Sequence, residues 1–350
     1  MNDAPVNDTR KAELLSKAVE HIDIKSFDAR PIVEAMRKMS FTSRDLGRAA
    51  DIYNSMLSDP DCSIILVIAG STSAGGCMDL YADLVKHNMV DAIVATGATI
   101  VDMDFFEGLG HKHYQAVEIP DDDTLRSLYI DRIYDTYIDE EQLQDTDHTI
   151  AGIANGLEAK PYSSRAFIRE MGRWLTEHGR KDNSLVKLAF EHDVPIFCPA
   201  FTDSSAGFGL VKHQVDRMKT GQPYLTLDSI ADFRELTDIK IKAGTTGLLM
   251  IGGGVPKNFA QDTVVCAEIL GHEDVEVHKY AVQITVADVR DGACSSSTLQ
   301  EAASWGKVST ALEQMVFAEA TSVLPLLASD AYHRGHWKSR ARRTFGRLFD

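Results

Sequence analysis

The sequence predicts an α/β fold of the Rossmann-like, doubly wound type, in which a mostly parallel sheet follows a helical N-terminal extension. The first observation behind this prediction is a change of period near residue 63. There, apolar residues at helical three- and four-residue spacing give way to continuous β-branched runs. The second is the unit formed by strand 63–70, a helix around 78–87 and strand 91–96. Two such strands with a helix between them form a parallel pair with a right-handed crossover.

Length and composition fit a globular protein and exclude several classes of function. The chain has 350 residues, of which 44% are hydrophobic and 25% are charged. Its 36 Lys and Arg residues face 52 Asp and Glu residues, and the net charge of −16 argues against nucleic acid as a partner. No apolar run approaches the roughly 20 residues of a membrane span, and the first residues lack an apolar signal core. A cytoplasmic protein without a membrane partner is therefore expected. The five cysteines are scattered without CxxC spacing, so no metal site is expected.

The first sixty residues are predicted to be helical, because apolar residues recur there at three- and four-residue spacing. The expected helices cover residues 11–22, 30–41 and 41–57. No internal repeat and no Pro/Gly-rich linker splits the rest of the chain. We therefore divide the sequence into a helical extension, one α/β domain and a basic tail, with boundaries at 1–62, 63–332 and 333–350.

Alternating helical and strand patterns continue through the α/β domain. An amphipathic helix is predicted over 163–179, with Arg and Glu on its outer face. Continuous apolar runs predict further strands at 194–199, which leads into a loop over 200–209, at 246–251 and at 278–285. After another loop, at 286–298, helical spacing predicts a helix over 300–320, which 322–332 continues after a break near Pro325.

Small and polar residues follow several of the predicted strands. The segments are GSTSAGG at 70–76, TGA at 96–98 and GGG at 252–254. The carboxyl ends of parallel strands form the ligand crevice of such folds, and glycine lets the backbone approach a phosphate. None of the segments is a complete GxGxxG motif, but together they predict a dinucleotide site. Asp102 is a candidate to bind a ribose hydroxyl, and an ordinary surface acid is the alternative.

The segment EAASWGK at 301–307 places a lysine two residues after a tryptophan. Packing against the indole of Trp305 would partly desolvate Lys307 and favour its neutral, nucleophilic form. Neutral lysine adds to imines and aldehydes, and it is a common covalent catalyst of carbonyl-type chemistry. Spacing alone leaves open that Lys307 is a surface lysine packed on a tryptophan.

The motifs SWGK, GGGVPK and KHNMVDAIVATGA resemble those of the deoxyhypusine synthase family, in the family's order and over about Ser63–Leu327. In that family, NAD oxidises the secondary amine of spermidine to an imine. The butyl-imine passes to an active-site lysine and then to an acceptor amine, and the retained NADH reduces it. The resemblance implies that Lys307 is this lysine and that the domain 63–332 binds NAD. It also implies a homotetramer with its sites at dimer interfaces.

The resemblance further implies roles for individual residues. Glu301 and Trp305 would line the polyamine tunnel, and Asp291, Gly292 and Ser295 match a loop that touches cofactor and substrate. The remaining positions that match the family's cofactor site are Thr96, Gly97, Ala98, Asp102, Asp203, Gly253, Gly254, Ala318 and Glu319.

Three positions depart from the family pattern. The general-base histidine is replaced by Asn258, which can exchange hydrogen bonds with a substrate but cannot take a proton near neutral pH. Phe208 and Cys294 fall where the family has amine-binding carboxylates. Each lost charge-assisted contact is worth about 1.5–3 kcal/mol, so other groups must bind the ammonium groups of the substrate.

These matches and departures predict a transferase that moves an aminoalkyl (aminobutyl) group between small amines or polyamines, as homospermidine synthases do, with NAD as cofactor. One alternative is deoxyhypusine synthesis on a lysine of a translation factor, which Asn258 and Phe208 disfavour. A second is a non-catalytic NAD-binding protein, which the retention of Lys307 disfavours. The tail 333–350 either binds an acidic surface of a neighbouring subunit or is solvated.

Overall fold

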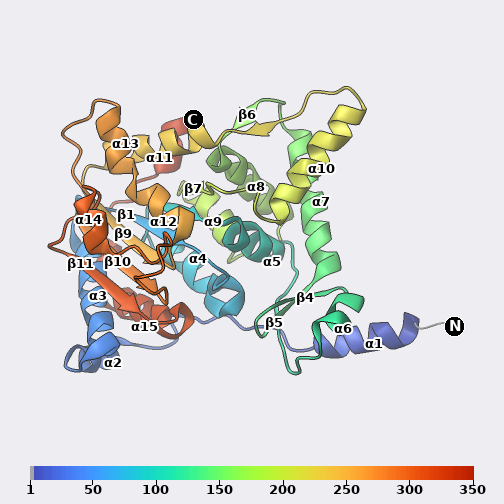
Figure 1. The fold of residues 1–350 in the computed structure, drawn as a ribbon, viewed down its shortest axis with the longest axis horizontal. Coiled ribbons are helices and arrows are strands. Elements are labelled where there is room, and N and C mark those ends of the chain that lie inside the picture. The colour runs from blue at the N-terminus through green and yellow to red at the C-terminus, as the bar shows by residue number, and fades with distance from the viewer. Residues whose placement is uncertain (1–3) are drawn as a thin grey trace.

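Six parallel strands form the central sheet of a computed structural model that describes residues 4–350 (Figure 1). From edge to edge the strands are β11 (Glu313–Phe317), β10 (Tyr280–Thr285), β9 (Thr246–Ile251), β1 (Ser63–Ile68), β2 (Ala92–Ala95) and β7 (Ile196–Phe197). From the centre, the chain adds β2 and β7 on one side of β1, and β9, β10 and β11 on the other. This is the order of a doubly wound sheet, with its switch point between β1 and β9. The predicted fold class is confirmed.

The central strand β1 is buried on both faces, as its continuous apolar run predicts. Ile65 lies opposite Ala92 of β2 and Leu248 of β9. Even-numbered residues of β1 belong to one core layer and odd-numbered residues to the other, because side chains alternate along a strand. The two layers carry the helices on the two faces of the sheet.

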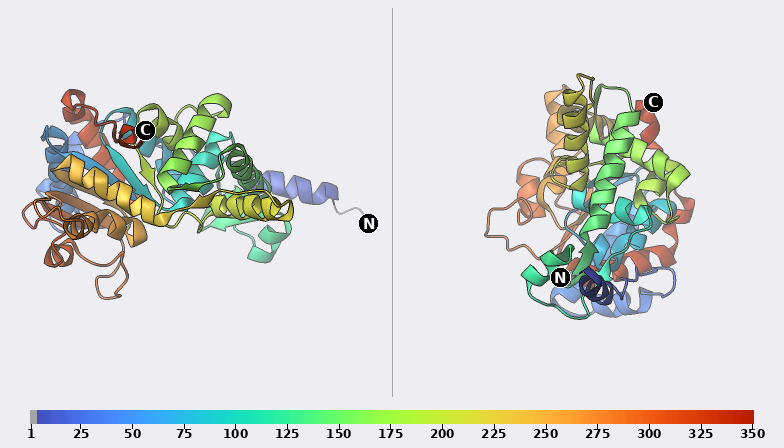
Figure 2. Two further views of the ribbon diagram at one scale, coloured as in Figure 1. Left: turned by 90° about the horizontal axis from the view of Figure 1, so that it is seen from above. Right: turned by 90° about the vertical axis from the view of Figure 1, so that its right-hand side faces the viewer.

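Helices cover both faces of the sheet (Figures 1 and 2). The larger layer contains α3 (Phe41–Ser58), α4 (Met78–Lys86), α8 (Ser164–His178), α9 (Leu185–Glu191) and α15 (Ala320–Arg334). The smaller layer contains α11 (Ser229–Ala243), α12 (Gly254–Gln261) and α14 (Leu299–Ser304), and α13 (Thr263–Ile269) packs on α11.

The other elements lie around this core. Short helical turns follow β1 and β2: η1 (Ser73–Cys77), η2 (Ala98–Phe105) and α5 (Phe106–Gly108). An antiparallel sheet is formed by β3 (Tyr114–Gln115), β5 (Thr136–Asp139) and β4 (Ile130–Ile133). A second small sheet pairs β6 (Pro161–Tyr162) with β8 (Thr226–Leu227). The remaining helices are α1 (Ala4–Leu14), α2 (Arg30–Arg37), α6 (Asp122–Ser127), α7 (Glu140–Gly156) and α10 (Ser205–Lys219). No helix within residues 4–350 is both long and apolar enough to cross a membrane.

The predicted helix over 11–22 is wrong beyond Leu14, where α1 ends. The following residues pair with the chain near β3 instead. The N–H of Val19 donates to the carbonyl of His113, and Ala18 forms a bridge with Tyr114. The backbone groups that a helix would use are therefore taken by a partner about 95 residues away. The predicted helix over 30–41 also ends early, at Arg37.

The C-terminal half contains the largest error of the sequence analysis, because the predicted helix over 300–320 is not continuous. α14 ends at Ser304, Gly306 has a left-handed φ of 69°, and β11 occupies Glu313–Phe317. Conversely, α15 has no break at Pro325 and runs from Ala320 to Arg334. Proline there removes one backbone donor close to the start of the helix. The loop predicted over 200–209 also ends early, because α10 begins at Ser205.

The basic tail packs against acidic groups of its own chain. The side chain of Arg340 is 4% exposed, and its guanidinium lies 2.6 Å from the carboxylate of Asp91, which immediately precedes β2. Arg347, in the short turn η4 (Phe345–Phe349), pairs with Asp193 at 2.7 Å. The side chain of Arg340 is therefore withdrawn from solvent, whereas that of Arg347 remains 69% exposed.

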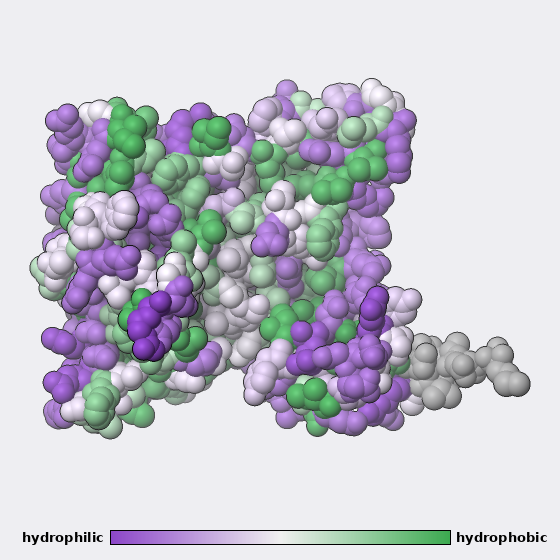
Figure 3. Space-filling view, viewed as in Figure 1, coloured by the Kyte–Doolittle hydropathy of each residue, from purple (hydrophilic) through white to green (hydrophobic). Residues whose placement is uncertain are grey.

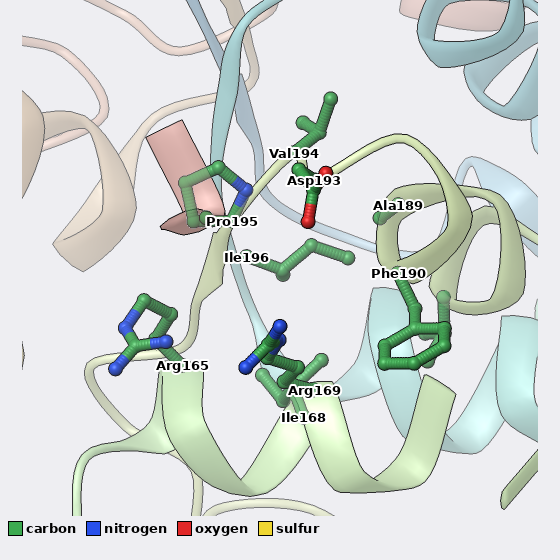
Figure 4. A pocket seen from close by; sticks show the side chains of 11 residues that line it. Arg165, Ile168, Arg169, Ala189, Phe190, Asp193, Val194, Pro195 and Ile196 are labelled. Atoms are coloured by element: carbon green, nitrogen blue, oxygen red, sulfur yellow. The ribbon is translucent and has the colours of Figure 1, made fainter. Parts of the chain in front are cut away.

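A pocket of about 20 Å³ lies between α8, α9, β7 and the tail. Figure 4 shows Arg169 of α8 pointing toward Ile196 and Asp193, whereas the end of the Arg165 side chain turns to one side. The space is about that of one water molecule, so it cannot hold a cofactor.

Candidate active site around Lys307

A cavity of about 560 Å³ opens between α12, α13, α14 and the loop that follows β10. Five residues that the sequence analysis proposed for the substrate site line it: Lys307, Trp305, Glu301, Gly292 and Asn258. Cys294 lines it as well, and the thiol is free. The walls are completed by apolar residues of α11 and α13, namely Phe233, Val265 and Ile269.

Lys307 follows α14 and is held by backbone hydrogen bonds on both sides of the turn. Its N–H donates to the carbonyl of Ala302 at 3.1 Å, and its own carbonyl accepts from the N–H of His278 at 3.0 Å. The ammonium nitrogen lies 5.5 Å from the ring centroid of Trp305. Trp305 is 67% exposed, so in a single chain the indole covers the lysine without closing the cavity.

Sequence reasoning missed Asp262, which lies between α12 and α13 and also lines the cavity. Its Oδ1 lies 2.5 Å from Nζ of Lys307. Its Oδ2 accepts a hydrogen bond of 2.7 Å from Nδ2 of Asn258. The only local signal was the four-residue spacing from Asn258 to Asp262, which places both side chains on one helical face.

Lys257 was part of the GGGVPK motif, but the sequence analysis gave it no role. It is 1% exposed. Its ammonium donates to the carbonyls of Cys294 and Ser297 and, at 3.1 Å, to the Ser297 hydroxyl. A buried lysine therefore ties α12 to the loop that forms one wall of the cavity. Burial lowers the pKa of Lys257 to about 8.

Replacing Lys257 with methionine tests this burial through the pH dependence of stability. Between pH 8 and 10.5, the unfolded chain keeps a proton on residue 257 that the folded protein has released. Stability therefore rises with pH across this window, and the parent should gain about 3 kcal/mol of unfolding free energy over Lys257→Met. Below pH 8 the difference should be constant. Urea unfolding at a series of pH values measures it.

The matched control is Lys219→Met, because Lys219 is exposed on α10. It reports the effect of the same lysine-to-methionine change at a position that is not buried. A Lys257→Met difference that does not change between pH 8 and 10.5 would contradict the lowered pKa of Lys257.

The glycine segment after β9 meets the loop after β10. A Cβ built on Gly253 would lie 2.4 Å from Cα of Ser295, and Gly254 has a left-handed φ of 63°. Gln283 of β10 bridges the two segments, because its side-chain amide donates to the carbonyls of Gly252 and Ser295. The structure thus brings together the predicted cofactor residues of these two loops. Asp291, in the same loop, accepts from the N–H of Ala293 at 2.7 Å.

A second group of predicted cofactor residues meets at the ends of β2 and β7. These residues are Thr96, Gly97, Ala98, Asp102 and Asp203. A Cβ on Gly97 would lie 2.4 Å from Cβ of Ser204. The N–H of Ser205 donates to Oδ1 of Asp102 at 2.9 Å, and burial raises the pKa of Asp102 to about 6.

Glu319 and Ala318 come directly after β11. Glu319 caps α15 by accepting hydrogen bonds from the N–H groups of Thr321 and Ser322. A Cβ on Gly75, in the loop after β1, would lie 3.4 Å from the Thr321 methyl. The capped end of α15 therefore lies beside the GSTSAGG loop.

The substrate positions do not all meet within one chain. In the described part of the chain, no residue that lines the Lys307 cavity comes from 96–104 or 200–219. Phe208, which occupies an amine-binding position by resemblance, is 65% exposed on α10. The Lys307 cavity and the α10 position are therefore separate features of a single chain.

The family model and two similar relatives agree on one family. The deoxyhypusine synthase family model matches residues 31–331. A deoxyhypusine synthase-like protein from Coxiella burnetii (strain RSA 493 / Nine Mile phase I) is 73% identical over 340 residues, covering 97% of this chain and 96% of the relative. Its counterpart from Caulobacter vibrioides is 68% identical over 347 residues, covering 99% and 94%. A crystal structure assigned to deoxyhypusine synthase from Entamoeba histolytica superposes with a TM-score of 0.61. At 20% identity, over 90% of this chain and 97% of that one, it supports the fold alone.

Proposed function

This chain belongs to the deoxyhypusine synthase family, and we propose that it is an NAD-dependent transferase of aminoalkyl groups between small amines. The observation that carries the proposal is Lys307, whose ammonium nitrogen lies in a cavity between the Asp262 carboxylate and the Trp305 ring. In the proposal, catalysis belongs to residues 63–332 and Lys307 carries the aminoalkyl group between donor and acceptor.

The side chains of the cavity suit an amine substrate. Carboxylates attract ammonium groups, and Asp262 and Glu301 place two of them in the cavity wall. The face of Trp305 attracts a cationic carbon chain and excludes water from one side. Small amines are favoured as substrates over a protein lysine because Asn258 and Phe208 replace the groups that protein-modifying members of the family use.

The loops at the carboxyl ends of the strands fit a dinucleotide. Gly253 and Gly97 each pack so closely on a neighbouring loop that a Cβ would collide with it, and glycines of dinucleotide-binding folds serve such close packing at the ends of strands. Asp102 is a half-buried carboxylate suited to a ribose hydroxyl. When bound, NAD would accept a hydride from the carbon next to the donor nitrogen and later return it.

Protonation of Asp102 should weaken NAD binding in acid. Because burial raises the pKa of Asp102 to about 6, the carboxylate that accepts a ribose hydroxyl is lost as pH falls through 6. A charge-assisted hydrogen bond is worth about 1.5–3 kcal/mol, so affinity should fall about tenfold or more between pH 7 and pH 5. Asp102→Asn should bind weakly at both pH values. Calorimetric titration with NAD measures both, and an equal pH dependence in Asp102→Asn would contradict the assignment.

We also propose that the active species is a homo-oligomer, as the family's tetramers suggest. α10 presents an exposed apolar stripe made of Phe208, Val211, Val215 and Met218. Ile269 and Leu270, at the end of α13, are exposed too, and Figure 3 shows hydrophobic side chains gathered over both regions. Such patches on a globular protein mark interaction surfaces. A second copy on the α10 stripe would also bring Phe208 toward a neighbouring site.

Placing a charge in this stripe should weaken the assembly. Val211→Glu would bury an unpaired carboxylate and should weaken association about tenfold or more, with a parallel loss of activity. Lys38→Glu, at the exposed C-terminal cap of α2, is the control. Light scattering measures the mass of each variant. A fully active parent at the 38.6 kDa mass of one chain would contradict the oligomer.

The experiment that tests the proposed function is an amine panel. Purified protein is incubated with NAD and pairs of di- and triamines, and the products are identified by mass spectrometry. A new polyamine, formed only with NAD present, is expected. Modification of a translation-factor lysine without any small-amine product would support the protein-modifying activity instead.

A further inference from the structure

Within the part of the chain that the structure describes, Lys307 has one close partner that can take a proton. Asp262 Oδ1 lies 2.5 Å from its Nζ, while Asn258 presents an amide oxygen at 3.4 Å. Glu301 is the second carboxylate of the cavity, but its oxygen accepts from the backbone N–H of Thr298 in the capping box of α14. Lys257 is buried behind the loop and donates to its carbonyls. Among the described residues, Asp262 is therefore the charged group that meets Lys307.

The carboxylate of Asp262 is aimed by its surroundings. The backbone N–H of Asp262 donates to the carbonyl of Asn258 at 2.9 Å, and its own carbonyl accepts from Cys266 at 2.9 Å. The amide of Asn258 then holds Oδ2 at 2.7 Å, which leaves Oδ1 facing the lysine. Asn258 cannot accept a proton itself, but it fixes the carboxylate that can.

We infer that Asp262 is the proton acceptor for Lys307 and that Asn258 is the positioning residue that aims it. The inference rests on the proposed function, in which a nicotinamide dinucleotide is the oxidant that turns the donor amine into an imine. It assigns to a carboxylate the task that the missing histidine performs elsewhere in the family.

The transfer of the aminoalkyl group to Lys307 needs no proton donor or acceptor other than Asp262, Lys307 and the donor nitrogen. Asp262 takes one proton from the Lys307 ammonium, and the freed electron pair attacks the carbon of the protonated donor imine. A C–N bond to Nζ forms, and the π electrons of the imine move to the donor nitrogen. A proton then passes from Nζ to the donor nitrogen, the bond from carbon to that nitrogen breaks, and a protonated imine on Lys307 remains. The departing amine takes up the proton held by Asp262, so protons and charge are conserved.

A test without NAD isolates this step. Butanal with cyanoborohydride alkylates Lys307 through the same proton transfers, because Asp262 takes the lysine proton and returns it to the departing oxygen. Peptide mass spectrometry gives the rate at Lys307, with exposed Lys219 as the internal reference. Asp262→Asn should slow Lys307 by about 10²-fold, the usual contribution of a positioned acid–base group. A purely electrostatic pair predicts the reverse, since losing the carboxylate would release the amine and speed the reaction.

The swap variant Asn258→Asp with Asp262→Asn is the matched control, because it keeps the composition and charge of the pair. Its carboxylate replaces the amide that lies 3.4 Å from Nζ, so it should recover at least about tenfold of the lost rate. Labelling of Asp262→Asn at or above the parental rate, or a folded swap variant without recovery, would overturn the inference. If Asp262→Asn does not fold, the labelling rate of the swap variant is compared directly with that of the parent. A rate within about tenfold of the parental rate supports the inference, and a lower rate overturns it.

The same variants in the amine assay separate this inference from the proposed function. Suppose that butanal labels Lys307 fastest in the parent, more slowly in the swap variant and slowest in Asp262→Asn, but that the parent transfers no aminoalkyl group with NAD. This result would refute the proposed function and would still support Asp262 as the proton acceptor. A parent that transfers the group, with Asp262→Asn transferring it equally well, would refute the proton acceptor alone.

Discussion

Replacing Lys307 with arginine is expected to abolish aminoalkyl transfer while leaving NAD binding unchanged. The guanidinium keeps a positive charge beside Asp262 but cannot give up a proton to become a nucleophile. Loss of a covalent nucleophile should lower the transfer rate by roughly 10³-fold or more. Product formation by mass spectrometry and NAD affinity by calorimetry are the two measurements.

The same substitution at Lys279 is the control, because Lys279 pairs with Asp59 at 2.8 Å at the start of β10 and lies outside the Lys307 cavity. Lys279→Arg should transfer at the parental rate. If Lys307→Arg did so too, the acceptor amine would have to attack a free imine directly, and the covalent role of Lys307 would be refuted.

Replacing Gly253 with leucine is expected to abolish NAD binding. Even a Cβ at this position would lie 2.4 Å from the backbone of Ser295, so the loop after β10 would have to move. The rest of the leucine side chain would displace Ser295 further and separate the two loops that meet here. Calorimetry with NAD is the measurement, and circular dichroism establishes that the variant is folded.

Gly152→Leu is the matched control, since a Cβ on this exposed glycine of α7 meets nothing within 4 Å. It should bind NAD as the parent does. An unchanged affinity in a folded Gly253→Leu variant would remove the glycine segments from the cofactor site.

Sequence reasoning succeeded where local pattern and burial agree. β9 occupies the predicted residues 246–251, and β1 ends two residues before the predicted 63–70. Both strands are buried on both faces, which is the structure that a short uninterrupted apolar run predicts. The strand–helix–strand unit then determined the parallel sheet and its winding.

Sequence reasoning failed where a distant partner decides the structure. β11 forms because Glu313 to Phe317 pair with Ala281 to Thr285 of β10, a contact that helical spacing in 300–320 cannot reveal. Asp262 meets Lys307 only because α12 and the turn after α14 converge, 45 residues apart in sequence. The buried pair of Arg340 with Asp91 joins two residues that are even further apart in the sequence. Spacing describes a single element, and these sites lie between elements.

The most direct test of the proposed function is borohydride trapping of Lys307 during turnover. The parent protein is mixed with NAD and an isotopically labelled donor amine, reduced with borohydride and digested, and the peptides are analysed by mass spectrometry. The proposed function predicts a labelled aminoalkyl group on the peptide containing Lys307, and only when both NAD and the donor are present. A protein that forms the transfer product while that peptide stays unlabelled would contradict it.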